Sequence, residues 1–88
     1  MPAFAVISTV LNDDLDRGVA NAYPDAFLKL SNTSWIVSDT NKTTKEVCDK
    51  IGIKAEGFSN AVVFKTDGYF GLAAPTIWEW LKVKGAGP

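Results

Sequence analysis

The sequence predicts one α+β domain, in which an antiparallel sheet is covered by helices. Three observations support this class. Strand and helix patterns alternate along the chain, and 88 residues are enough for one domain but not for two. A composition of 47% hydrophobic and 22% charged residues is that of an ordinary globular chain rather than a disordered one.

The first predicted strand, residues 3–11, is rich in β-branched side chains and almost continuously apolar. This pattern is typical of a central strand that is covered on both faces. An Asn-Asp-Asp triplet at residues 12–14 then supplies helix N-caps. Pro24 ends the helix, because the residue before a proline avoids helical dihedral angles. We therefore expect helix one over residues 14–23.

Two short strands are expected next, at residues 26–30 and 34–38. The Ser-Asn-Thr sequence between them is typical of a hairpin turn.

A second helix is expected over residues 44–51. Thr43 and Glu46 form a capping-box sequence, in which each side chain accepts a backbone N–H of the other residue. Gly52 stands where helices commonly end in a left-handed residue, which places Ile53 so that it packs back on the helix.

The C-terminal third contains one clear strand, residues 61–65. An Asp-Gly turn follows it and predicts a brief fifth strand at residues 69–72. Pro75 suits the first position of a short helix, which we expect over residues 76–82. The main elements thus occur in the ferredoxin-like order βαββαβ, which places both main helices on one face of the sheet. The domain is expected to span residues 1–84, with residues 85–88 as a flexible tail.

Composition excludes several kinds of chemistry. The chain has no histidine, which excludes His-dependent catalysis and His-ligated metals. Cys48 is the single cysteine, so neither an intrachain disulfide nor a cysteine–zinc cluster can form. The net charge of −1 gives no general attraction to nucleic acid, and no apolar run is long enough to cross a bilayer. We expect a cytoplasmic protein without a cofactor or a membrane partner.

Segments spread over nearly the whole chain resemble the small SinR-type proteins related to the CRISPR-associated adaptation nuclease subunit. These segments are Val10-Leu11-Asn12, Ser34-Trp35-Ile36-Val37, Lys45-Glu46-Val47, Val62-Val63-Phe64 and Trp80-Leu81-Lys82. The resemblance implies a ferredoxin-like subunit that dimerises. In the nuclease branch, an acidic residue at the end of strand one binds a divalent metal. Val10 stands at the position that aligns with it, and this departure argues against metal-dependent cleavage.

Two candidate sites have a simpler structural interpretation. Asp13 and Asp14 could hold Mg²⁺ as paired carboxylates, but they equally suit the start of a helix, where the helix dipole favours negative charge. Cys48 could be a nucleophile, but on an apolar helix face without a histidine it is better interpreted as a core thiol. We assign neither a catalytic nor a metal-binding residue.

Lys42, Lys45 and Lys65 are candidates for contacts with nucleic acid. Acidic residues are interspersed among the lysines of the second helix, and no RNA-recognition signature is present. A solvated helix face is the favoured interpretation.

The candidate interface residues are aromatic and lie near the C-terminus. Trp78 and Trp80 are separated by about 200° around a helix, so the two indoles cannot face the same core. Tyr69 and Phe70 lie in the predicted edge strand. These four residues are expected to anchor a homodimer.

The sequence leaves three functions open. The first is a non-catalytic module that dimerises and binds a partner protein. The second is a nucleic-acid-binding protein or a metal-dependent nuclease of the adaptation-subunit type. The third is a regulatory domain that senses a small molecule, because ferredoxin-like folds host many functions.

Overall fold

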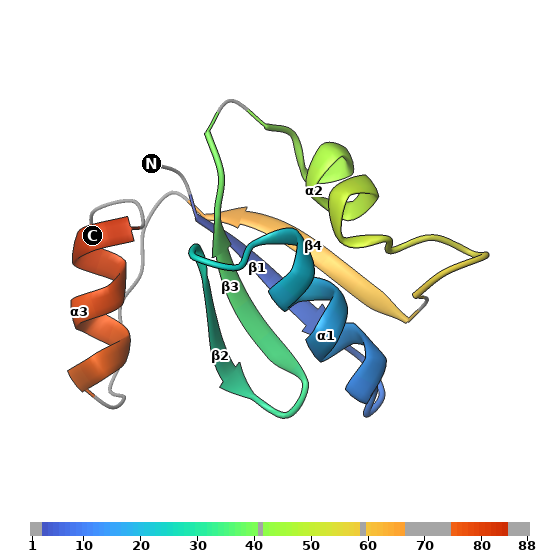
Figure 1. The fold of residues 1–88 in the computed structure, drawn as a ribbon, viewed down its shortest axis with the longest axis horizontal. Helices are drawn as coiled ribbons and strands as arrows, with labels where there is room; N and C mark the ends of the chain where they lie inside the picture. The colour runs from blue at the N-terminus through green and yellow to red at the C-terminus, as the bar shows by residue number, and fades with distance from the viewer. Residues whose placement is uncertain (1–2, 41, 59, 67–74, 85–88) are drawn as a thin grey trace.

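A computed structural model describes residues 3–40, 42–58, 60–66 and 75–84 (Figure 1). In chain order its elements are β1 (Ala3–Ser8), α1 (Asp13–Ala22), β2 (Phe27–Ser31), β3 (Ser34–Ser38), α2 (Thr44–Ile51), β4 (Ala61–Thr66) and α3 (Pro75–Lys84). The four strands form one sheet in the order β2-β3-β1-β4, and every neighbouring pair is antiparallel. The predicted α+β class is confirmed.

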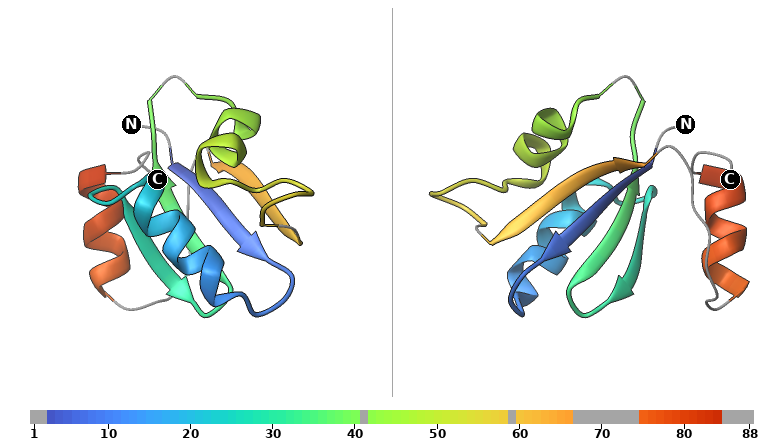
Figure 2. Two further views of the ribbon diagram at one scale, coloured as in Figure 1. Left: turned by 45° about the vertical axis from the view of Figure 1, so that its right-hand side comes forward. Right: turned by 180° about the vertical axis from the view of Figure 1, so that it is seen from behind.

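The helices are distributed unequally around the sheet. Helices α1 and α2 cover the same face and contact each other, whereas α3 lies beside β2 at one edge (Figures 1 and 2). Seen from behind, the sheet lies in front of α1, and α2 lies beyond β4 (Figure 2). The predicted placement of both main helices on one face is therefore confirmed.

The core lies between the sheet and helices α1 and α2. Side chains alternate between the two faces along a strand, so every second residue points toward the helices. Strand residues and helix residues of this layer together form one buried cluster: Phe4, Val6, Leu15, Val19, Tyr23, Trp35, Val37, Val47, Ile51 and Val63. Burial of these apolar side chains supplies the main driving force for folding.

Strand β1 departs from the prediction in two respects. It ends at Ser8 rather than at residue 11, because the chain bends at residues 9 and 10, where the Ser8 hydroxyl donates to the carbonyl of Val10. Thr9 donates its amide and its hydroxyl to the carbonyl of Asn60, at 2.7 and 3.0 Å. The strand is central in the sheet, as expected, but it is not covered on both faces. Ile7 remains 41% exposed on the side away from the helices.

Strand β3 has the predicted bounds, 34–38, and the boundaries of α1, β2, β4 and α3 shift by one or two residues. Helix α1 starts at Asp13, because the Asn12 side chain caps it by accepting the amides of Asp14 and Leu15. It ends before Pro24, as predicted. Strands β2 and β4 each end one residue later than expected, and α3 extends over Pro75–Lys84. The predicted fifth strand and the predicted tail lie outside the described residues.

Helix α2 confirms its prediction in full, including both caps. The Thr43 hydroxyl accepts the amide of Glu46 at 3.1 Å, and the Glu46 carboxylate accepts the amide of Thr43 at 2.9 Å. Gly52 ends the helix at φ 99°, in the left-handed region that favours glycine. Its amide and that of Ile53 both donate to the carbonyl of Cys48.

The segment that follows α2 returns to the helix pair through Phe58. The Phe58 amide donates to the carbonyl of Gly52, and its carbonyl accepts the amide of Lys54. A Cβ atom on Gly18 would lie 2.4 Å from Cε2 of Phe58. Glycine at this position in α1 therefore lets the ring pack directly on the helix backbone.

We predict that Thr43→Ala lowers the free energy of unfolding by about 0.5–2 kcal/mol, because it removes the capping hydroxyl. Chemical denaturation measures the change. Thr44→Ala, one position further into the helix, is the control and should have a smaller effect. A wild-type midpoint for Thr43→Ala would mean that this hydroxyl does not cap α2.

Candidate functional site

The face of the sheet opposite α1 and α2 is the candidate site. Strand alternation places on it the residues that do not enter the core. We call this surface the open face and define its apolar part by six residues from all four strands: Ala5, Ile7, Leu28, Ile36, Val62 and Phe64.

Register brings four of these side chains into one row across the sheet. Leu28 of β2 pairs with Ile36 of β3, Ile36 with Ala5 of β1, and Ala5 with Phe64 of β4. The small side chain of Ala5 therefore leaves a shallow depression, the low point of the row, between the larger side chains of Ile36 and Phe64. Ile7 and Val62 are paired in the row next to it.

The open face is apolar and accessible at the β1–β4 side. Val62 is 45% exposed and Phe64 is 54% exposed. Among the strand residues that the structure describes, none that points to this face is charged; serine and threonine supply its polar groups. Contiguous apolar surface of this kind on a small domain marks an interaction site more often than isolated exposed residues do.

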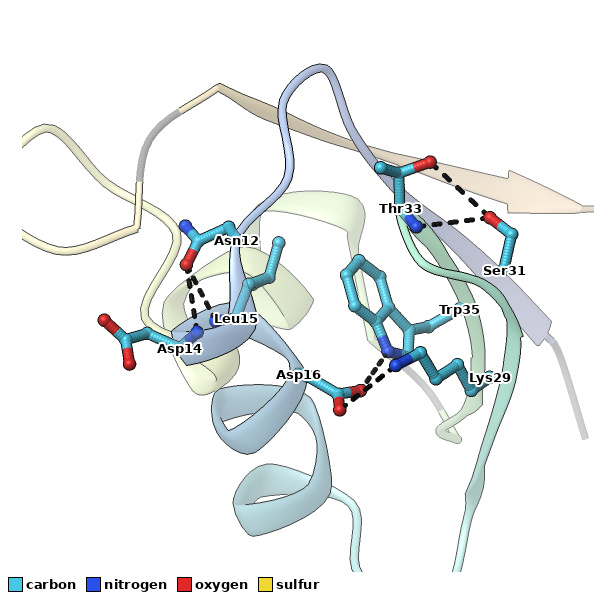
Figure 3. Close-up of polar contacts among 8 residues, drawn as sticks. All are labelled: Asn12, Asp14, Leu15, Asp16, Lys29, Ser31, Thr33 and Trp35. Atoms are coloured by element: carbon cyan, nitrogen blue, oxygen red, sulfur yellow. Dashed lines mark hydrogen bonds and ion pairs between the residues drawn. The ribbon is translucent and has the colours of Figure 1, made fainter.

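The opposite face fixes the orientation of the sheet relative to α1. Trp35 of β3 is fully buried, and its indole N–H donates to the Asp16 carboxylate at 2.8 Å (Figure 3). Lys29 of β2 donates to the other carboxylate oxygen at 3.3 Å. The Trp35 hydrogen bond is the main cause that lowers the pKa of Asp16, with a smaller contribution from Lys29.

The predicted interface residues are only partly located by the structure. Tyr69 and Phe70 lie outside the described residues, as does the side chain of Trp78. Trp80 is half-buried on α3, and its neighbour Leu81 is buried. The prediction that these four residues anchor a dimer remains a prediction.

The weak metal candidates lie in the first turn of α1. Asp14 forms an ion pair with Arg17, and both Asp13 and Asp14 are exposed. Adjacent helical residues point about 100° apart, so these two carboxylates do not converge on one cation. Within the described ranges, no group of three or more Cys, Asp or Glu residues is arranged to hold a metal ion. Val10 lies two residues beyond the end of β1 and is exposed.

The Cys48 side chain contributes to packing of the core. Its side chain is half-buried and packs against the core cluster. Burial raises the pKa of this thiol, and the nearby Asp49 adds to the effect. Both causes disfavour the thiolate, the form that a nucleophile requires.

The lysines proposed for nucleic acid do not share a surface with the open face. Lys42 precedes α2, and Lys45 in its first turn forms an ion pair with Asp49 at 2.9 Å. Lys65 alternates with Phe64 along β4 and therefore points to the other side of the sheet.

Sequence reasoning missed Ile7, Val62 and Phe64 as surface residues. The available signal is the run of apolar residues in strands one and four, which in strand one predicts burial on both faces. A strand with two apolar faces is equally compatible with one face in the core and one face open.

Comparison with known proteins assigns neither a family nor a function to the chain. No protein-family model matches the chain, and neither curated proteins nor solved structures gave a significant match. In the part of the chain that the structure describes, no helix combines the length and hydropathy needed to span a bilayer.

We predict that Asp16 makes the stability of the protein depend on pH. The carboxylate has a lower pKa in the folded state than in the unfolded state, so its stabilisation is present above the unfolded pKa, about 3.9, and is lost as the pH falls through the folded pKa. The difference in unfolding free energy between wild type and Asp16→Asn should therefore be largest near pH 6 and shrink toward pH 2. Asp13→Asn, in the same helical turn, is the control. A difference that does not vary with pH would contradict this role of Asp16.

We also predict that the purified protein does not cleave RNA or DNA in an EDTA-sensitive manner, because Asp13 and Asp14 do not converge and Val10 offers no ligand. Cleavage assays with Mg²⁺ and with Mn²⁺ test this. Robust cleavage that is abolished by EDTA and by Asp13→Ala would identify Asp13 as a ligand.

Proposed function

We propose that this chain is a small, non-catalytic, ferredoxin-like module that forms a homodimer through its open face and, as a dimer, binds a partner protein. The ferredoxin-like assignment is supported by the element order of β1 to β4 and by the strand order β2-β3-β1-β4, with every neighbouring pair antiparallel.

The observation that carries the proposal is the composition of the open face. Its accessible residues, Ile7, Val62 and Phe64, are large and apolar, and they adjoin one another on the two strands β1 and β4. Exposing such a patch to water is unfavourable by roughly 25 cal/mol for each Å². Covering it with an apolar surface therefore stabilises an assembly.

A second copy of the chain is a suitable occupant, because the open face is complementary to itself. Its described strand residues carry no charge that a different partner would have to match. In a two-fold symmetric pair, Phe64 of one copy can fill the low point at Ala5 of the other, and the reverse contact follows by symmetry. Sheets commonly pack face to face in this way, about 10 Å apart.

The size of the face sets the expected affinity. Four strands at a spacing of about 4.8 Å, each with five or six residues rising about 3.3 Å, give a footprint on the order of 350 Å². A standard interface buries about 800 Å² on each partner. The open face alone is therefore less than half the size of a standard interface, so we expect a weak dimer, with room for a contribution from α3.

Binding of nucleic acid is less well supported. A sheet that binds single strands presents stacking aromatic residues together with cations. The open face offers Phe64 but, over the strand residues described, no lysine or arginine. Lys45 is already paired with Asp49.

The proposal retains the resemblance to SinR-type proteins as a resemblance in scaffold and dimerisation only, because Val10 replaces the acidic residue of the nuclease branch. A cytoplasmic location belongs to the proposal as well. It is supported by Cys48, a single cysteine whose thiol is compatible with a reducing compartment.

We predict a weak monomer–dimer equilibrium, measurable by sedimentation velocity as a function of concentration. Phe64→Lys should shift the equilibrium to the monomer, because dimerisation would bury an unpaired charge. Ala5→Phe should weaken the dimer without changing the charge, because it fills the low point that receives Phe64.

The control is Leu11→Lys, which introduces the same charge at an apolar residue that is 74% exposed in the loop before α1. It should dimerise like wild type. The proposal is wrong if the wild type is a monomer at every attainable concentration, or if Leu11→Lys dissociates the dimer as effectively as Phe64→Lys does. Circular dichroism identifies any variant that is unfolded.

A further inference from the structure

The outer edge of β4 is a part of the sheet that the open face does not include. Strand β4 is last in the order β2-β3-β1-β4, so only its inner edge is paired within the sheet. At the other end of this order, β2 has α3 beside it (Figures 1 and 2). Of the two sheet edges, the one at β4 is therefore the candidate for binding another strand.

Backbone hydrogen bonds at the end of β1 define the edge to which each strand residue points. The Ser8 amide donates to the carbonyl of Thr33, toward β3, at 2.8 Å. The Thr9 amide donates to the carbonyl of Asn60, toward β4, at 2.7 Å. Both backbone groups of a strand residue point to the same edge, and successive residues alternate between the two edges. Within β1, the even-numbered residues therefore bond to β3 and the odd-numbered residues bond to β4.

The same alternation identifies the β4 residues whose backbone points outward. Ala61, Val63 and Lys65 are in register with even-numbered residues of β1, which bond to β3 instead. We call these three the outward residues, because their N–H and C=O groups point away from β1. Among the described residues, none of these groups has a hydrogen-bond partner outside the strands. They form a row of donors and acceptors that another extended chain can match.

The side chains on the two sides of this edge differ in character. On the open face, Val62 is 45% exposed and Phe64 is 54% exposed. On the helix side, Lys65 is exposed and forms no ion pair with another described residue. The edge is therefore apolar on one side and positively charged on the other.

Helix α2 covers the helix side of the space next to this edge, because it lies beyond β4 (Figure 2). Lys50 of α2 contacts the ring of Tyr23 at the end of α1. Cys48 is about 200° away from Lys50 around the helix, which places it on the side of α2 that is remote from α1. Its side chain is half-buried. A strand added to β4 would therefore lie under α2 and cover Cys48.

We propose that the outer edge of β4 binds an extended segment of a partner protein, which adds to the sheet as an antiparallel strand. The segment places apolar side chains beside Val62 and Phe64 and an acidic side chain beside Lys65. This inference specifies the partner-binding part of the proposed function, and it does not require the dimer.

A single segment suits this edge better than the edge of a second copy does. Antiparallel pairing of two β4 edges around a two-fold axis would place both α2 helices on the same face of the joined sheet. Each α2 lies beyond its own β4, so the two helices would occupy the same space. A partner segment brings no helix with it.

The probe is the peptide acetyl-EVTVT-amide, titrated into the ¹⁵N-labelled protein. In an antiparallel register its glutamate lies opposite Lys65, and its two valines lie opposite Phe64 and Val62. An N-methyl group on the third peptide residue removes a donor that faces β4, whereas one on the fourth residue removes a donor that faces away. The first methylated peptide should lose binding, and the second should retain it.

Amide exchange shows where the peptide binds. In the free protein, the amides of the outward residues should exchange with solvent faster than those of Val62 and Phe64. Saturating peptide should slow exchange in the outward residues only, and it should lower the rate at which Cys48 is alkylated.

Two variants of one residue separate the backbone from the side chain. Lys65→Ala should weaken binding about threefold, the effect of losing an exposed charge pair. Lys65→Pro removes the same side chain and also the outward amide, so it should bind at least about fivefold more weakly than Lys65→Ala. The sheet tolerates this proline, because the amide it removes makes no bond to β1. Both variants should self-associate like wild type in sedimentation, which keeps a failure of the edge distinct from a failure of the open-face dimer.

Four results would overturn the proposal. The first is the absence of saturable shifts at millimolar peptide. The second is protection of the outward amides in the free protein, which at low concentration would mean that the chain's own residues 67–74 cover the edge, and only at high concentration that a second copy does. The third is equal binding of the two methylated peptides. The fourth is equal affinity of Lys65→Pro and Lys65→Ala, with circular dichroism confirming that both are folded.

Discussion

Burial of the Trp35 indole is the interaction on which the arrangement of helix and sheet depends. Trp35 is the largest fully buried side chain among the described residues, and a buried N–H without an acceptor is costly. Asp16 supplies the acceptor from α1, while Leu15 and Val19 of the same helix enter the core. The hydrogen bond therefore sets the rotation of α1 about its axis and its position along β3.

The two sides of the sheet follow from this arrangement. Two helices can cover one face of a four-stranded sheet, and the core residues that they require occupy alternate strand positions. Packing of the core places no requirement on the strand residues that point to the open face. In antiparallel sheets with one solvated face, such residues are often polar. Here Ile7, Val62 and Phe64 occupy these positions. These side chains add nothing to the core, and the dimer proposed above rests on them.

Features with local causes could be predicted from the sequence, and features with distant causes could not. Helix α2 was predicted to the residue because Thr43, Glu46 and Gly52 act within one helical turn of its ends. The contact between Thr9 and Asn60 joins residues that are 51 positions apart, and no local pattern reports it. The open face was missed because an apolar strand does not reveal which of its faces a helix will cover. Phe58 packs on Gly18 of α1, a contact between distant segments that only the tertiary structure brings together.

The contact between Gly18 and Phe58 determines how easily the loop after α2 opens. The loop joins the helix pair through one aromatic ring and a few backbone hydrogen bonds, among them those between Gly52, Lys54 and Phe58. A segment held in this way can open without disturbing the sheet, at a free-energy cost well below that of global unfolding. The Phe58 ring therefore acts as the latch contact of this segment: without it, amide exchange and proteolysis would accelerate in the loop after α2 while the sheet stays protected.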